Sequence, residues 1–144
     1  MAITEFRGDY AFLSNFYTVP VRYNGLVYGS SEAAFQAAKA PDKDKEKFTN
    51  ISPGEAKRLG RHYKRYDWFN ISLQVMHDVV LCKFSQNENI KELLLSTGDE
   101  ELVEGNTWND TFWGMCNGVG QNQLGKILMQ VRSEIREGKF DPTP

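Results

Sequence analysis

Residues 68–84 read WFNISLQVMHDVVLCKF, and this stretch decides the fold. Its apolar side chains recur every three to five residues, as on the buried face of an α-helix. The residues that share this spacing are Trp68, Ile71, Val75, Met76, Val79 and Phe84. We therefore predict a long helix whose apolar stripe lies in the core.

The segments before this helix predict a hairpin and two further helices. In Val19–Tyr28 the pair Asn24-Gly25 is typical of a tight turn between two short strands. A helix is predicted over 32–39, where a preceding serine can cap it and alanines favour it. A capping box at Ser52–Glu55 then predicts a helix that carries the basic residues between Lys57 and Arg65.

The segments after it predict a short strand at Leu102–Glu104, an aromatic, glycine-rich loop over 105–120, and a last helix from about Asn122. Short strands among several helices indicate an α+β fold that is predominantly helical. The length of 144 residues suits one domain over 1–144, and the tail 139–144 is expected to be frayed.

Composition excludes several classes of protein. Seventeen Lys and Arg against 19 Asp and Glu give a net charge of −2, so no overall positive field attracts nucleic acid or an acidic membrane. The sequence has no run of 18 apolar residues and no signal-peptide pattern at its start. Two cysteines and two histidines form no metal motif. We expect a reduced cytoplasmic protein with no membrane, metal or cofactor requirement.

Three segments combine reactive groups with aromatic rings and glycines. Helical spacing over 32–39 places Glu32, Gln36 and Lys39 on one face, where they form either a reactive row or an ordinary exposed polar one. The segment 104–114 contains two carboxylates and two indoles, which either stack on a planar ligand or pack on the core; they are Glu104, Asp110, Trp108 and Trp113. The glycine-rich run 114–125 leads into a helix start, which suits an anion but matches no known phosphate motif.

The basic run between Lys57 and Arg65 has two interpretations. Five Lys and Arg in nine residues of a helix usually form a solvated face. They can also supply local contacts to phosphate on a protein whose net charge is slightly negative.

These segments together resemble one known family. The motifs that carry the resemblance span almost the whole chain and occur in order; they are FLSNF at 12–16, YGSSE at 28–32, FQAAK at 35–39, Trp68, VM at 75–76, KF at 83–84, LVE at 102–104, NDTFWG at 109–114 and GQNQLGKILMQVR at 120–132. In these residues the sequence resembles the YbiA-like family, also called NADAR. The resemblance implies a single YbiA-like domain.

The resemblance also implies an N-glycosidase that breaks a ribose C1′–N bond. Some members of the family act on phosphoribosylamino-pyrimidine intermediates of riboflavin synthesis, and others remove ADP-ribose from guanine in nucleic acid. Relatives of the riboflavin type often have His after the glutamate of the second motif, whereas this chain has Ala33. This difference and the basic run favour ADP-ribose removal from guanine in DNA or RNA. The alternatives are the riboflavin intermediate, or a module that binds ADP-ribose or a nucleotide without catalysis.

Such a reaction needs a carboxylate near C1′ and donors for the departing nitrogen. The predicted catalytic residues are Glu32, as the principal carboxylate, Lys39, as a phosphate ligand or Schiff-base nucleophile, Asp110 and Glu104. The predicted substrate-binding residues are Asn15, Gln36, Trp68, Trp108, Trp113, Gly114 and Asn122. A pure binder of an anionic ligand would be better without the carboxylates. We expect the motifs containing Glu32, Glu104, Trp113 and Asn122 to converge on one cleft.

Overall fold

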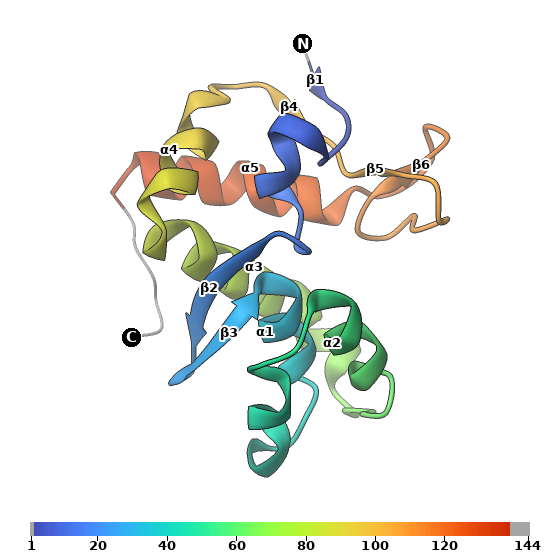
Figure 1. The fold of residues 1–144 in the computed structure, drawn as a ribbon. Coiled ribbons are helices and arrows are strands. Elements are labelled where there is room, and N and C mark those ends of the chain that lie inside the picture. Colours follow the sequence, from blue (N-terminus) through green and yellow to red (C-terminus); the bar gives the residue numbers. More distant parts are fainter. Residues whose placement is uncertain (1, 139–144) are drawn as a thin grey trace.

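The structure, a computed structural model, describes residues 2–138 and has an α+β fold in which helices predominate (Figure 1). The helices are α1 (Ser31–Ala37), α2 (Pro53–Gly60), α3 (Trp68–Gln86), α4 (Glu88–Ser96) and α5 (Gln123–Arg136), with 3-10 helices at Gly8–Leu13 and Asp42–Phe48. The strands are β1 (Ala2–Ile3), β2 (Thr18–Tyr23), β3 (Leu26–Ser30), β4 (Glu101–Leu102), β5 (Gly105–Asn106) and β6 (Met115–Cys116). The tail that we expected to be frayed lies outside the described residues.

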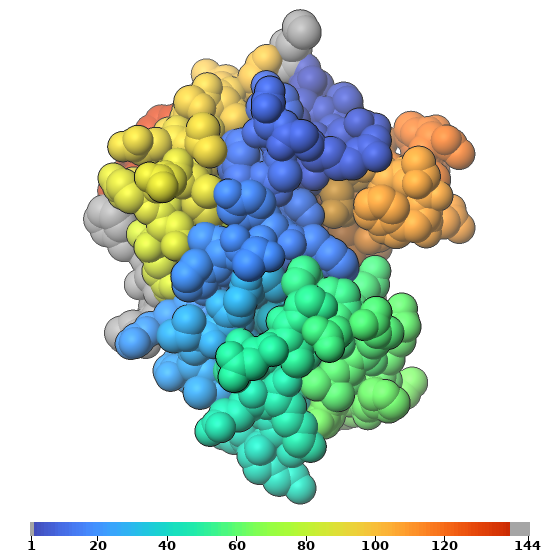
Figure 2. All heavy atoms as spheres, in the orientation of Figure 1, coloured from blue at the N-terminus to red at the C-terminus, as the bar shows by residue number. Residues whose placement is uncertain are grey.

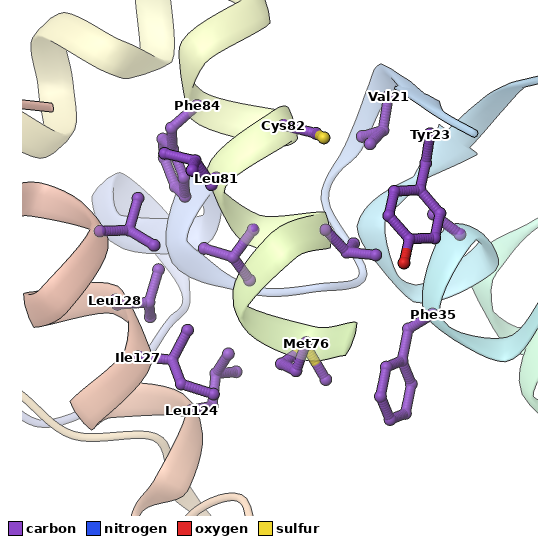
Figure 3. Close-up of a cluster of buried hydrophobic side chains, with 14 of the residues drawn as sticks. Val21, Tyr23, Phe35, Met76, Leu81, Cys82, Phe84, Leu124, Ile127 and Leu128 are labelled. Atoms are coloured by element: carbon purple, nitrogen blue, oxygen red, sulfur yellow. The ribbon is translucent and has the colours of Figure 1, made fainter. Parts of the chain in front are cut away.

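Helix α3 is the central element of the core, and the predicted apolar stripe is confirmed. Val79 and Phe84 are fully buried, and Met76 is 2% exposed. Figure 3 shows α5 on one side of this helix, with Leu124 and Leu128 directed toward it. The β2–β3 hairpin and α1 pack on its other side. The helix therefore separates two layers.

The β2–β3 hairpin has the predicted turn, because Asn24 and Gly25 both have positive φ angles, of 50° and 89°. Both angles belong to the turn types that match the twist of an antiparallel pair. On the edge of β2 that does not pair with β3, the side chain of Gln86 makes the two backbone hydrogen bonds that a further strand would make. Its Oε1 accepts from the Arg22 backbone N–H at 2.7 Å, and its Nε2 donates to the Arg22 carbonyl at 2.8 Å. The hairpin is thus fixed to the end of α3.

Side-chain caps define the starts of α1 and α2. The Ser30 hydroxyl accepts from the Ala33 N–H at 3.1 Å, and Ser52 and Glu55 form the predicted capping box. Helix α2 ends at Gly60, so the prediction that one helix carries the whole basic run was wrong. From Arg61 onward the chain forms a turn, because the Arg61 and His62 N–H groups donate to the carbonyls three residues earlier, those of Arg58 and Leu59.

Two short parallel pairs join distant parts of the chain. Strand β1 pairs with β4, and β5 pairs with β6. Of the predicted strand at Leu102–Glu104, only Leu102 belongs to β4, and the next two residues connect β4 to β5. Val103 extends the contact with the N-terminal segment, since its N–H donates to the Ile3 carbonyl. These pairs hold the N-terminal segment against the loop that follows β5. No helix between residues 2 and 138 is long and apolar enough to cross a membrane.

Candidate functional site

A cavity of about 1270 Å³ lies where the N-terminal segment, α1, α2 and the loop between β5 and β6 meet. In Figure 2 the blue N-terminal residues, the green α2 region and the orange loop adjoin one another at the surface. Seven of the eleven predicted site residues line the cavity; they are Asn15, Glu32, Gln36, Glu104, Trp108, Asp110 and Trp113. Lys39, Trp68, Gly114 and Asn122 lie outside its lining. All four motifs expected to share one cleft therefore have side chains at the same cavity, the fourth through Leu124 and not through Asn122.

Glu32 is a buried carboxylate that its neighbours hold in place. Its backbone N–H donates to the Asn15 carbonyl at 3.0 Å, and its Oε2 accepts from Gln36 Nε2 at 2.6 Å. Burial raises the pKa of Glu32, whereas the Gln36 hydrogen bond and the nearby charges of Lys57 and Lys39 oppose that rise. The side chain is thus fixed in position at the wall of the cavity.

Asn15 and Gln36, predicted to orient ligand hydroxyls, are largely engaged by the protein itself. Asn15 accepts from the Ser31 hydroxyl at 2.8 Å and contacts the Met76 sulfur through its amide nitrogen. Gln36 donates to Glu32, while its Oε1 is buried without a hydrogen-bond partner. Their first effect is therefore to fix Glu32 and the start of α1.

Glu104 lines the same cavity in a different environment. Burial, and then the charges of Asp110 and Glu32, raise the pKa of Glu104 to about 7, while Lys57 lowers it. Like charges in a dry site disfavour simultaneous ionisation, so this group keeps a proton to a higher pH than an ordinary glutamate. A carboxyl group that titrates near neutral pH is suited to act as a general acid.

Asp110 mainly organises the loop between β5 and β6. Its Oδ1 accepts from the Trp113 N–H at 2.9 Å and from the Phe112 N–H at 3.1 Å. Asn106 bonds both the carbonyl and the N–H of Asp110, at 2.9 and 3.1 Å. These bonds hold the loop in one shape, so Asp110 supplies structure and negative charge to the site together.

The predicted indoles have three different environments. Trp68 packs on Phe35 with ring centres 5.0 Å apart, and Trp113 packs on the same ring at 5.4 Å. Trp108 is 61% exposed and lies at the cavity. The Lys39 ammonium is 5.6 Å from the centre of the Trp68 ring, and burial lowers the pKa of Lys39. Trp68 and Lys39 therefore support the wall behind the cavity lining.

Asn122 and Gly114, both predicted substrate-binding residues, lie against the Glu104 segment. Asn122 Oδ1 accepts from the Glu104 N–H at 3.0 Å, and its Nδ2 donates to the Leu102 carbonyl at 3.0 Å. Gly114 lies directly beneath Glu104, where a Cβ atom would be 2.8 Å from Glu104 Oε2 and would collide with its carbonyl. A residue with a side chain at position 114 would displace Glu104.

We expect Gly114→Ala to lower the free energy of unfolding by about 1–3 kcal/mol, the usual effect of forcing a methyl group into a packed site. Urea denaturation measures it. Gly29→Ala is the matched control, because a Cβ at Gly29 meets no atom within 4 Å and this glycine has no positive φ. Equal stability of Gly114→Ala and the wild type would contradict the close approach of Glu104.

Lys57 and Phe16 also line the cavity, and sequence reasoning did not select either as a site residue. The Lys57 ammonium lies 6.0 Å from the centre of the Phe16 ring, and its charge acts on both Glu32 and Glu104. The capping box predicts the position of Lys57 on α2, but the neighbouring sequence does not show that this side chain is directed to the cavity. Phe16 is the last residue of the first motif of the resemblance. Its 45% exposure marks it as a site residue, and the sequence does not show that exposure.

Metal ligation has no candidate among residues 2–138, since they contain no group of three His, Cys, Asp or Glu side chains that could hold an ion. The groups gathered at the cavity are carboxylates, lysine and aromatic rings. Such a set can perform acid–base chemistry beside a planar ligand.

Comparison with known proteins gives the relationships of the chain. It is 38% identical over 133 residues to N-glycosidase YbiA of Escherichia coli, covering 88% of this chain and 82% of that protein. It is 40% identical over 136 residues to an N-glycosidase of Nostoc punctiforme, covering 88% and 86%. A riboflavin biosynthesis protein of Vibrio vulnificus is 41% identical over 135 residues, which cover 90% of this chain and 36% of that protein, so the chain spans about a third of its length.

The fold has a solved counterpart in the NMR structure of the Escherichia coli protein YbiA. The two agree with a TM-score of 0.83 at 33% sequence identity, over 96% of this chain and 85% of that one. The model of the NADAR domain matches residues 4–136. From these matches and the shared fold, the chain belongs to the NADAR domain family.

Proposed function

We propose that the protein is an N-glycosidase that hydrolyses a ribose C1′–N bond, and that its substrate is ADP-ribosylated guanine in nucleic acid. The observation that carries the proposal is the pairing of Glu32 and Glu104 in one cavity, where burial raises the pKa of both carboxyl groups and the charge of Glu32 adds to the rise at Glu104. A protein that only binds an anionic ligand gains nothing from two buried carboxylates. The N-glycosidase names of its relatives in Escherichia coli and Nostoc punctiforme agree with this activity.

The proposed reaction divides the work between the two carboxyl groups. Glu104, with a pKa of about 7, donates a proton to the base nitrogen as the C1′–N bond breaks. Ionised Glu32 stabilises the positive charge that develops at C1′ and accepts a proton from the attacking water. The products are the free base nitrogen carrying hydrogen and a ribose carrying hydroxyl at C1′.

Lys57 and Lys39 are proposed to keep Glu32 ionised, because both charges lower its pKa. Lys39 has two possible further roles: it binds phosphate, or it attacks the opened sugar as a Schiff-base nucleophile. Its place over the Trp68 ring, outside the cavity lining, favours the electrostatic role. Trp108, which is exposed at the cavity, is the best placed indole to stack on the departing base.

The cavity size supports the larger of the two candidate substrates. Sites for drug-sized ligands are commonly about 300–1,000 Å³, and this cavity of about 1270 Å³ has room for an ADP-ribosyl group. Ala33, where riboflavin-type relatives often have His, is fully buried and does not line the cavity. The difference at that position therefore carries less weight than the cavity.

Hydrolysis of a riboflavin intermediate is the second candidate function, because one relative favours it. The Vibrio vulnificus relative at 41% identity is named a riboflavin biosynthesis protein. Hydrolysis of a phosphoribosylamino-pyrimidine would use the same two carboxylates on a smaller ligand.

One experiment decides between the substrates. The purified protein is incubated separately with guanine-ADP-ribosylated oligonucleotide, the phosphoribosylamino-pyrimidine and NAD, and released ADP-ribose or ribose phosphate is measured by mass spectrometry. We expect release of ADP-ribose from the oligonucleotide at a rate at least tenfold above that of the other two. Cleavage of the pyrimidine alone would establish the second candidate, and binding of ADP-ribose without any cleavage would establish a non-catalytic module.

A further inference from the structure

Two large aromatic side chains lie almost wholly in solvent next to the basic run. Tyr66 is 98% exposed and Phe69 is 90% exposed, the highest values among the large hydrophobic residues between positions 2 and 138. Single exposed apolar residues are common. Two such rings within four residues, at the start of a long helix, are a feature of binding surfaces.

The segment that holds these rings is ordered by polar contacts. Arg65 donates to both carboxylate oxygens of Asp67, at 2.6 and 3.3 Å, and to the Ala38 carbonyl at 2.9 Å. Between the two exposed rings, Trp68 is packed against Phe35 with ring centres 5.0 Å apart. The rings are therefore presented by a fixed backbone. Arg65 is engaged within the protein, so it is a poor candidate for a phosphate contact.

The charge around the rings is positive. The segment 55–69 contains five Lys and Arg but only two acidic residues, Glu55 and Asp67. Glu55 is bound to the Ser52 cap and Asp67 to Arg65. Within the segment 55–69, the exposed cations that have no carboxylate of the described residues within ion-pair distance are Lys57, Arg58, Arg61 and Lys64. Cations beside exposed rings are the combination that binds unpaired nucleic acid, through phosphates and stacked bases.

The surface begins at the candidate site. Lys57, at one end of the segment, lines the cavity, and Trp68, near the other end, touches Phe35, which also lines it. A strand whose modified base occupies the cavity would therefore meet this segment at Lys57.

We infer that Tyr66 and Phe69 form a stacking platform for unpaired bases that flank the modified nucleotide, so that the protein acts on single-stranded nucleic acid. The inference rests on the proposed function for its polynucleotide substrate. Bases in a duplex are already stacked on their neighbours and cannot stack on these rings. The platform therefore distinguishes single strands from duplexes, which a basic surface alone does not.

The test measures binding of a fluorescent, unmodified single-stranded DNA of about 12 nucleotides by fluorescence anisotropy, with the matching duplex alongside. We expect the single strand to bind more tightly than the duplex. The double variant Tyr66→Ala, Phe69→Ala should weaken single-strand binding at least tenfold, since stacking contributes about a factor of ten per base or more. It should leave the slope of affinity against salt unchanged, because the phosphate contacts remain. Tyr10→Ala is the matched control, as Tyr10 is 42% exposed and lies outside the segment.

Cleavage of a free ADP-ribosylated guanosine separates this inference from the proposed function. The double variant should cleave the nucleoside at the wild-type rate and lose activity only on the oligonucleotide. Equal binding of duplex and single strand, or full binding by the double variant, would overturn the platform. So would concentration-dependent self-association that the double variant abolishes without any effect on DNA, since the rings would then serve a second copy of the chain. Absence of all cleavage, with binding that still depends on both rings, would refute only the proposed function.

Discussion

Replacement of Glu32 by Gln is expected to lower kcat for N-glycoside hydrolysis by at least a hundredfold, or about 2.7 kcal/mol of barrier. The substitution keeps the size of the side chain and an oxygen that can accept from Gln36 Nε2. It removes the negative charge that would stabilise C1′. Because the carboxylate is buried and its pKa is raised, loss of the charge should leave the free energy of unfolding unchanged or increase it. Steady-state kinetics and urea denaturation together measure the two effects.

Glu101→Gln is the control for this result, since Glu101 also lines the cavity but is exposed on β4. It should retain wild-type kcat. If Glu32→Gln keeps turnover within about tenfold of the wild type, the principal carboxylate is Glu104 or Asp110 instead. Glu104→Gln distinguishes the assigned roles. The wild-type rate should fall above about pH 7 as Glu104 loses its proton, and this variant should lack that limb of the profile.

Replacement of Lys83 by Met is expected to increase the free energy of unfolding by about 1–4 kcal/mol at pH 7, as for other buried charges exchanged for apolar groups. Lys83 is fully buried, and burial lowers its pKa from 10.5 to about 7. Its ammonium donates to the Ser14 carbonyl at 2.8 Å, and lies 5.8 Å from the centre of the Tyr17 ring and 4.9 Å from that of the Phe84 ring. The Ser14 carbonyl keeps a second donor, the Tyr17 N–H at 3.2 Å, so the variant does not orphan it.

The lowered pKa of Lys83 also determines how the free energy of unfolding changes with pH. Between about pH 7 and 10.5 the unfolded chain binds a proton at Lys83 that the folded chain does not, so wild-type stability rises with pH over this window. The Met variant should lose that rise. Lys83→Arg should destabilise at every pH because guanidinium stays charged, and Lys126→Met, at an exposed position of α5, should change little. Destabilisation by Met across pH 6–10 would show that the ammonium contributes more than its burial costs.

Local patterns account for what the sequence could predict of the fold. The stripe of α3, the Asn24-Gly25 turn and the Ser52–Glu55 capping box each depend on residues within a few positions of one another. The parallel pairs β1–β4 and β5–β6 join segments of two residues each, so they have no periodicity to detect. The basic run contains no local signal for the end of α2 at Gly60, and the close approach of Gln36, which leaves no room for a Cβ at that position, is a contact between distant parts of the chain.

The same limit applies to the candidate site. Glu32 and Glu104, which the structure places in one cavity, were predicted because the reaction implied by the resemblance needs a carboxylate near C1′. Asn122 and Trp68 were predicted as ligand contacts, whereas the first holds the Glu104 backbone and the second packs on Phe35. Polar and aromatic residues that support a site have the same composition as those that touch a ligand. Only the direction of each side chain separates them.

The contact between Gln86 and the outer strand of the hairpin has a consequence for association between chains. An open strand edge presents unpaired backbone groups that can recruit a strand from another molecule and so begin aggregation. On β2 the Gln86 amide occupies the N–H and carbonyl of Arg22, and the Asn87 amide donates to the Pro20 carbonyl at 2.8 Å. Proline itself offers no N–H at that position. The end of α3 thereby closes the edge of a two-stranded sheet against intermolecular pairing.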